Sequence, residues 1–248
     1  MSETLSRTNH PQTRPAECVA GGSKDFEDFV YLISHDVRSS VRALIELPQW
    51  IAEDLEESGV KLDGAVAENI KMMNRHTGRL DRMLVDLLAF SRIGRMQQAQ
   101  IVDLNAALTD VLDEITVPSG FQIIRALDAA DAFIGERDIL TLLSALISNA
   151  IKHHDRETGK IIVSSLRKNN QTLISVCDNG PGIPEGYHAR VFEAMTTLKP
   201  RDEVEGSGMG LAMIQKIARH YHGTASIRTN ARTRGTCIEV YLPSQLRA

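Results

Sequence analysis

The stretch that decides the fold is Asp-Asn-Gly-Pro-Gly-Ile, residues 178–183, which follows an apolar segment with the character of a strand. A carboxylate at a strand end followed by two glycines lets the backbone approach a flat ligand, and the carboxylate accepts a hydrogen bond from an exocyclic amine. The glycines predicted to make this approach are Gly180 and Gly182.

A second glycine cluster, Gly206-Ser207-Gly208-Met209-Gly210-Leu211, runs directly into a predicted helix. Glycines at a helix N-terminus expose backbone N–H groups that bind phosphate. A dinucleotide-binding fold would place such a cluster straight after a strand. Here it follows a polar segment, residues 185–205, which excludes the Rossmann interpretation. That segment is predicted to be a mobile lid, with an ordinary solvent loop as the alternative.

Upstream, a helix predicted over residues 137–153 carries Asn149, Lys152 and His153 within about one turn. An asparagine supplies a hard oxygen for Mg²⁺, and a lysine supplies a point charge for phosphate. The order of an Asn/Lys helix, Asp-Asn-Gly-Pro-Gly, a lid and a glycine-led helix is hard to obtain by chance.

The rest of this half predicts an α+β layer sandwich. Further helices are expected over 104–115 and 209–221, and strands over 121–127, 160–165, 172–177, 225–229 and 236–242. The turn between the strands expected over 160–165 and 172–177, Lys168-Asn169-Asn170-Gln171, is typical of a hairpin. We assign residues 99–248 to this domain, with a boundary near residues 96–100.

Residues 24–98 show apolar residues spaced by alternating fours and threes, which predicts two long helices with a heptad seam. The seams are Phe26, Val30, Ile33, Val37, Ser40, Leu44, Leu47 and Ile51, and then Val66, Ile70, Met73, Thr77, Leu80, Leu84 and Leu87. A turn at residues 58–64 makes them an antiparallel hairpin. One hairpin leaves apolar surface uncovered, so a homodimeric four-helix bundle is expected. An arm packed on its own chain is the alternative.

His35 lies between seam positions Ile33 and Val37, and at about 100° per residue it points away from both, toward solvent. A neutral imidazole is a good nucleophile near pH 7, and the neighbouring Asp36 can orient it or take up a proton. A histidine next to an aspartate on a protein surface is more often an ordinary solvated pair than a nucleophile with its helper.

Composition narrows the class of protein. With 28 basic and 32 acidic residues among 248, and no long basic run, nothing suggests nucleic-acid binding. No segment reaches the ~20 apolar residues of a membrane span, and no signal-peptide pattern is present. Three cysteines, Cys18, Cys177 and Cys237, form no CxxC pair, which predicts reduced thiols in a cytoplasmic protein. Residues 1–23 are expected to be a flexible tail.

With these residues assembled, the chain resembles the sensor histidine kinases over nearly all of residues 24–243. Residues 34–39 look like the phosphoacceptor box, 148–153 like the asparagine box, 178–182 and 206–211 like the two glycine boxes, 191–193 like the phenylalanine box, and Gly235-Thr236 like the final strand motif. These boxes are shared with ATPases of the gyrase and Hsp90 types.

The resemblance implies a catalytic domain that binds ATP and Mg²⁺ and a hairpin that dimerises. Asp178 would contact the adenine amine and Asn149 would coordinate Mg²⁺, while Lys152 and the glycines at 206, 208 and 210 would hold the phosphates. His35 would receive the γ-phosphoryl group and pass it to an aspartate of a response regulator. Input would come from a separate sensor protein.

Three positions depart from the family pattern: Ser40 stands for the usual proline, Ala145 for an earlier asparagine, and Ser39 for the Thr or Asn linked to phosphatase activity. Two alternatives follow. One is a histidine phosphotransfer protein with a degenerate ATP-binding domain, and Ala145 favours this alternative. The other is a serine kinase of the anti-sigma-factor type. The heptad hairpin argues against it, because such kinases resemble the catalytic domain alone.

Overall fold

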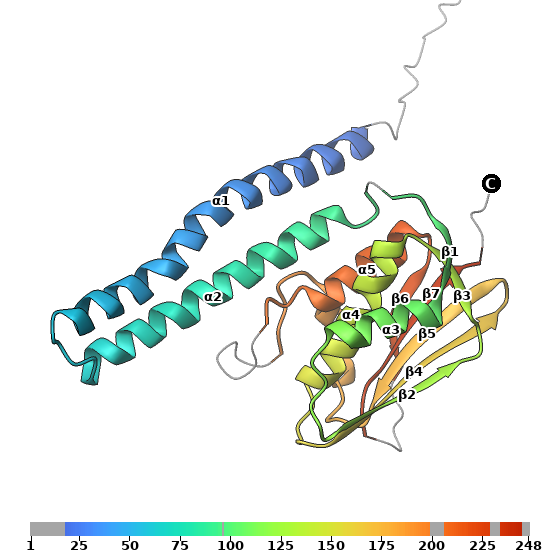
Figure 1. The fold of residues 1–248 in the computed structure, drawn as a ribbon. Helices are drawn as coiled ribbons and strands as arrows, with labels where there is room; N and C mark the ends of the chain where they lie inside the picture. Colours follow the sequence, from blue (N-terminus) through green and yellow to red (C-terminus); the bar gives the residue numbers. More distant parts are fainter. Residues whose placement is uncertain (1–17, 96, 199–205, 229–233, 245–248) are drawn as a thin grey trace, which may run out of the picture.

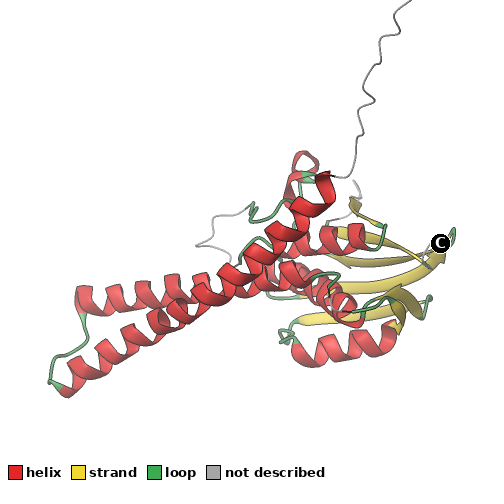
Figure 2. Cartoon of the chain, turned by 90° about the horizontal axis from the view of Figure 1, so that it is seen from above, coloured by secondary structure: helices red, strands yellow, loops and turns green. Residues whose placement is uncertain are grey.

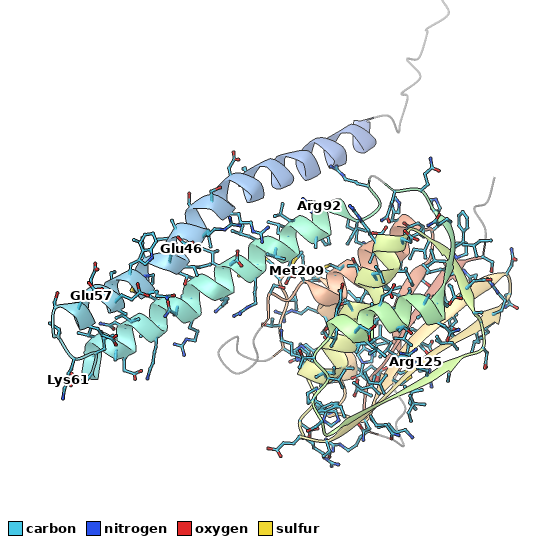
Figure 3. The ribbon with its side chains drawn as sticks, in the orientation of Figure 1. Glu46, Glu57, Lys61, Arg92, Arg125 and Met209 are labelled. Carbon is cyan, nitrogen blue, oxygen red and sulfur yellow. A yellow bond between two sulfur atoms is a disulfide. The ribbon has the colours of Figure 1, made fainter. Side chains whose placement is uncertain are left out.

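The computed structural model describes residues 18–95, 97–198, 206–228 and 234–244, with side chains at Ile33 and from Asp36 onward. The predictions for the tail before residue 18 and for lid residues 199–205 lie outside these. A long helical hairpin stands beside a domain in which helices cover one face of a sheet (Figures 1 and 2). The α+β class predicted from the sequence is confirmed.

The hairpin consists of α1 (Cys18–Glu57) and α2 (Gly64–Arg92), joined by a turn in which Gly59 and Gly64 adopt positive φ. Residues 18–23, which the sequence analysis placed in a flexible tail, form the start of α1. A glycine costs only about 1 kcal/mol against alanine within a helix, so Gly21 and Gly22 do not stop a 40-residue helix from extending.

The two helices meet along a face of α1 that the heptad analysis did not select. Val41 and Pro48 are buried, one heptad apart, on the side where Arg38 pairs with Asp81 of α2 at 3.8 Å. The helix continues through Pro48. The predicted α1 seam instead stays open to solvent, since Ile33, Val37, Leu44, Leu47 and Ile51 remain 39–46% exposed.

The second part contains a five-stranded sheet in the order β2-β4-β5-β7-β6. Only the β2–β4 pair is parallel, and the other pairs are antiparallel. The strands are β2 (Phe121–Leu127), β4 (Gly159–Lys168), β5 (Gln171–Asp178), β6 (Thr224–Arg228) and β7 (Cys237–Pro243). The helices α3 (Leu104–Glu114), α4 (Glu136–Lys152) and α5 (Gly210–His220) cover one face of it (Figure 1).

These predicted elements are confirmed with ends shifted by a few residues. Asn169 and Asn170, with φ of 48° and 60°, form the predicted two-residue turn between β4 and β5. Positive φ at both central residues gives the turn the twist of its strands. The side chain of Asp103 caps α3 by accepting from the N–H groups of Asn105 and Ala106 at 2.7 and 3.0 Å.

Four short elements were not expected from the sequence. A separate two-stranded sheet pairs β1 (Gln100–Asp103) with β3 (Asp131–Ile134), and the 3₁₀ turns η1 (Glu185–Tyr187) and η2 (Arg190–Phe192) lie in the predicted lid segment. Four-residue strands carry too few alternations for periodicity to detect.

The prediction that all three cysteines are reduced is wrong for two of them. Cys177 on β5 and Cys237 on β7 face each other in the antiparallel register, with Cα atoms 4.0 Å apart, and their sulfurs form a disulfide. Spacing in the sequence did not indicate it because the two strands are 60 residues apart and become neighbours only in the sheet.

Buried hydrogen bonds tie the end of α2 to the α/β part. The Asp138 carboxylate accepts from the N–H of Gly94 at 3.0 Å and from the Tyr221 hydroxyl at 2.7 Å. The Tyr221 oxygen in turn accepts from the N–H of Gly135 at 3.0 Å. Burial and the neighbouring Asp138 carboxylate raise the pKa of Tyr221 above its usual range, so the hydroxyl keeps its proton.

Candidate nucleotide-binding site

A cavity of about 620 Å³ opens between α4, the carboxyl end of β5, the start of α5 and the C-terminal third of α2. This volume is typical of sites for small molecules and cofactors. The sequence-predicted residues that line it are Asn149, Lys152, His153, Asp178, Gly182, Gly206, Gly208, Gly210 and Thr236. The fold therefore brings the two glycine-containing segments, residues 178–183 and 206–211, to the same cavity.

Asp178, the last residue of β5, projects into this cavity because it lies two residues beyond Val176, which faces the core between sheet and helices. Its Oδ1 atom accepts from the N–H of Gly180 at 2.8 Å and from the N–H of Thr236 at 3.1 Å. Burial raises the pKa of Asp178 above its ordinary value, while these two N–H groups and His154 oppose the rise. The carboxylate is thus oriented, half-buried and able to accept a further hydrogen bond.

The turn after Asp178 is fixed from outside the predicted set by His154, a contact that the sequence analysis missed. The Oδ1 of Asn179 accepts from the backbone N–H of Lys160 at 2.7 Å and lies 3.1 Å from the Nε2 of His154. The His154 ring also packs edge-on against Phe121. Nothing in the local sequence marks His154, because its partners Asn179 and Phe121 come from two other segments.

Gly180 does not line the cavity, although the sequence placed it in the site. It serves the turn instead, since a Cβ there would lie 3.0 Å from the Asp178 Oδ1 atom. Gly182 has φ of +83° and faces the carbonyl of Gly235, which a Cβ would approach to 3.2 Å. Gly235 itself packs directly on the backbone of Asp178.

The C-terminal end of α4 places polar side chains in the same cavity. Asn149 is half-buried on the last turn, and its carbonyl accepts from the N–H of the C-cap residue His153 at 3.1 Å. The Lys152 ammonium lies close to the second glycine cluster, since a Cβ on Gly206 would be 2.7 Å from its Nζ. A cationic side chain and exposed backbone N–H groups together favour a phosphate chain in this part of the cavity.

The glycine cluster has its own backbone requirement at one position. Gly208 has φ of +76°, and a Cβ there would lie 2.7 Å from the carbonyl oxygen of Thr196. By contrast, a Cβ on Gly210, the first residue of α5, would meet nothing within 4 Å. The Met209 N–H is already used, because it donates to the Ser207 hydroxyl at 3.1 Å.

One wall of the cavity comes from the hairpin, which the sequence analysis did not foresee. Arg82, Val85, Asp86 and Ala89 of α2 line it, and the Ser207 hydroxyl donates to the Asp86 carboxylate. Nearby, the Lys216 ammonium of α5 donates to the Phe90 carbonyl at 2.9 Å and lies 4.4 Å from the centre of the Phe90 ring. Such contacts depend on how the two parts pack, and no local motif encodes them.

The remaining predicted residues, His35 and Asp36, lie on α1, and the Asp36 side chain does not line the cavity. Asp36 is exposed, and the His35 side chain is outside the described part of the structure. None of the described side chains of α1 lines the cavity.

The residues present fit a nucleotide-bound Mg²⁺ ion. Among the described residues no group of three or more His, Cys, Asp or Glu side chains gathers into a metal site. Mg²⁺ at phosphates needs no such cage, because it takes one or two protein oxygens together with phosphate oxygens and water. The Asn149 amide lines the cavity and offers one such oxygen.

A comparison with known protein families gives a match to part of the chain. Residues 135–246 match the family described as Histidine kinase-, DNA gyrase B-, and HSP90-like ATPase. The matched region contains every cavity-lining residue that the sequence analysis had proposed.

Curated relatives extend the similarity to the hairpin. The chain is 28% identical to the adaptive-response sensory kinase SasA of Rippkaea orientalis over 222 residues, covering 86% of this chain and 56% of that protein. It is 29% identical to the signal transduction histidine-protein kinase AfsQ2 of Streptomyces coelicolor over 260 residues, covering 98% of this chain and 46% of that protein. The chain thus spans about half the length of these relatives.

The fold is also that of a solved structure, full-length ShkA in complex with AMPPNP. The TM-score is 0.65 at 20% identity, covering 90% of this chain and 47% of that one. Within the described residues, no helix has both the length and the apolar character that crossing a membrane requires.

Proposed function

We propose that this chain is a protein histidine kinase, because residues 135–246 match a family of ATPases that includes histidine kinases and the chain is 28–29% identical to two curated kinases. It uses ATP and Mg²⁺ to phosphorylate His35 and transfers the phosphoryl group to an aspartate of a response regulator. The observation that carries the proposal is the convergence of Asn149, Asp178 and the 206–210 backbone on one cavity.

Each cavity residue has a role that follows from its chemistry. The Asp178 carboxylate accepts a hydrogen bond from the exocyclic amine of adenine, and Thr236 orients that carboxylate through its N–H. Lys152, His153 and the N–H groups of the glycine cluster neutralise and position the phosphates. Asn149 and phosphate oxygens would hold Mg²⁺, which would offset the charge that develops during transfer.

The first transfer forms a bond between an imidazole nitrogen of His35 and the γ-phosphorus while the bond from that phosphorus to the leaving ADP oxygen breaks. The proton displaced from the ring passes to solvent or to the Asp36 carboxylate, which is next in sequence and exposed. In the second transfer a response-regulator carboxylate attacks the phosphorus and the phosphorus–nitrogen bond breaks.

The proposed transfer requires movement, because among the described residues the hairpin lines the cavity with α2 and not with α1, the helix that carries His35. Residues 99–248, as the catalytic domain, would leave α2 and carry the nucleotide toward α1, with the hinge between residues 93 and 99. Residues 24–98 would form the dimerisation domain. The exposed apolar stripe on α1 supports a homodimeric four-helix bundle, since a second hairpin would cover it.

Incubation with γ-labelled ATP and Mg²⁺ tests the proposal, with wild type, His35→Gln and Asn149→Ala compared side by side. Acid-labile label on wild type, lost in both variants, is expected. Label that survives in His35→Gln would place the phosphoryl group elsewhere and overturn the assignment of His35. Acid-stable label on an added partner would instead indicate a serine kinase.

A phosphotransfer protein is the second candidate, and one observation favours it. Ala145, where the family pattern has an asparagine, lines the cavity, so one polar group expected there is missing. No label from ATP, but label from a phosphorylated response regulator, would select this candidate. A separate sensor protein and a cytoplasmic location belong to the kinase proposal and are tested by co-purification and by cell fractionation.

A further inference from the structure

A disulfide lies behind the nucleotide cavity, on the opposite face of the same strands. Side chains alternate along a strand, so Cys177 faces away from the cavity that Asp178 faces. Cys237 is directly opposite Cys177 on β7, next to Thr236. Neither cysteine lines the cavity. The bond therefore joins the two strand ends that carry the adenine-binding groups without occupying the site.

The two residues beyond the disulfide are themselves paired. The N–H of Asp178 donates to the Thr236 carbonyl at 2.8 Å, and the N–H of Thr236 donates to the Asp178 Oδ1 at 3.1 Å. The covalent bond is thus one residue from the contact that orients the Asp178 carboxylate. Any loosening of these strand ends changes how much freedom Asp178 loses when a nucleotide binds.

The surroundings suit a reversible bond rather than an inert one. Arg228, at the end of β6, directs its Nη2 atom to the sulfur of Cys237 at 3.2 Å and to that of Cys177 at 3.9 Å. Its Nε donates to Glu239 at 2.5 Å, which fixes the guanidinium in place. A guanidinium beside a thiol favours the thiolate, which is the reactive form. Cys237 is buried, whereas Cys177 is only half-buried and reachable by a small thiol.

We propose that Cys177 and Cys237 are a redox-responsive pair that tunes nucleotide binding, with the disulfide form binding ATP more tightly. The coupling rests on the ATP-binding part of the proposed function. Its physical basis is preorganisation, because the disulfide restrains the ends of β5 and β7 before the nucleotide arrives. Disulfides that form in reducing compartments are usually transient or redox-sensing.

The exchange balances with a small disulfide such as oxidised glutathione. The Cys177 thiolate attacks one sulfur of the oxidant, forming a mixed disulfide and releasing one glutathione thiolate. The Cys237 thiolate, stabilised by Arg228, then attacks the Cys177 sulfur and releases the second. Two electrons pass from the cysteine pair to the oxidant, and the two thiol protons end on the two glutathiones. A dithiol reductant reverses the sequence.

The test uses the full chain with Cys18→Ser, which removes the third cysteine. Samples are equilibrated in glutathione buffers of graded ratio, alkylated and weighed by mass spectrometry, with and without AMPPNP and Mg²⁺. Calorimetry on fully oxidised and fully reduced samples gives the Kd of AMPPNP. We expect the Kd to rise about fivefold on reduction, the lower end of usual coupling between sites.

Linkage then fixes a second result. If oxidation tightens AMPPNP binding about fivefold, saturating AMPPNP must make the disulfide about fivefold harder to reduce, a shift of roughly 20 mV. Cys177→Ser and Cys237→Ser should bind AMPPNP as the reduced protein does, at any glutathione ratio. Arg228→Gln should slow oxidation several-fold, whereas the matched variant Arg125→Gln on β2, which bonds Thr109 instead, should not.

Equal AMPPNP affinity in the two redox states, or no oxidation of the pair by glutathione, would overturn this proposal and leave the kinase assignment standing. Absence of AMPPNP binding in both states would overturn the proposed function and the coupling with it. The redox titration uses a chain that keeps both Cys177 and Cys237, so a misfolded Cys177→Ser protein does not remove the test.

Discussion

The carboxylate of Asp178 is held in the cavity at a cost to the stability of the folded protein. Its carboxylate is half-buried and accepts two backbone N–H bonds, and burial still raises its pKa above 3.8. The ionised carboxylate therefore costs the folded protein stability: the free energy of unfolding falls as pH rises from the unfolded to the folded pKa. That cost is consistent with a group retained for binding.

Nucleotide affinity should depend on pH through this residue. A protonated Asp178 accepts the adenine amine poorly, so affinity should fall as pH drops through its raised pKa, by up to about tenfold per pH unit below it. Calorimetry with AMPPNP from pH 7 to 4 measures this. Asp178→Asn should bind about 10- to 100-fold more weakly at pH 7, because a hydrogen bond to a charged group is lost. A pH dependence of the same size in that variant would assign the effect to another group.

The buried hydroxyl of Tyr221 gives a prediction about stability. Tyr221→Phe should lower the free energy of unfolding by about 1–3 kcal/mol, because the Gly135 N–H and the Asp138 carboxylate each lose a partner. Denaturant titration measures it. The control Tyr187→Phe, at a side chain that is 43% exposed, should change stability by no more than about 0.5 kcal/mol. Equal effects in both variants would contradict the role given to the network.

At the scale of the elements, the glycine cluster before α5 places the strictest requirement on residue type. Gly208 has positive φ and no room for a Cβ beside Thr196. Gly208→Ala should cost about 1 kcal/mol or more in local strain and weaken AMPPNP binding at least tenfold. Gly78→Ala, in the middle of α2 with nothing within 4 Å, should be neutral or stabilising by up to about 1 kcal/mol. Unchanged AMPPNP affinity in Gly208→Ala would show that the loop tolerates a side chain.

The longer elements could be predicted because each carries its own periodicity or turn residues. The segment 121–127 appears in the structure with those same ends, and the Asn169-Asn170 turn is where its sequence placed it. What the sequence could not predict depends on packing between distant segments. The Cys177–Cys237 bond, the His154–Asn179 contact and the α2 wall of the cavity all join residues that meet only in the folded chain.

At the scale of the whole molecule, the apolar stripe on α1 predicts association. Leu44 and Leu47 remain 46% and 41% exposed within one chain. Leu47→Glu should convert a dimer to monomer, or weaken it at least tenfold, because a charge would be buried between hairpins. Light scattering during size-exclusion chromatography measures the mass. Gln49→Glu adds the same charge on the polar side of α1, where Gln49 bonds Glu53, and should leave the mass unchanged.

The short connection between the two parts sets a geometric limit. Only residues 93–99 separate α2 from β1, and fully extended they span roughly 25 Å. Once the hydrogen bond between Gly94 and Asp138 opens, a triphosphate bound in the cavity could reach only points within a limited distance of the C-terminal end of α2. Its effective concentration would be high at a histidine within that distance and negligible at any other histidine. In the proposed kinase reaction, the tether as well as the chemistry would then select which imidazole is phosphorylated.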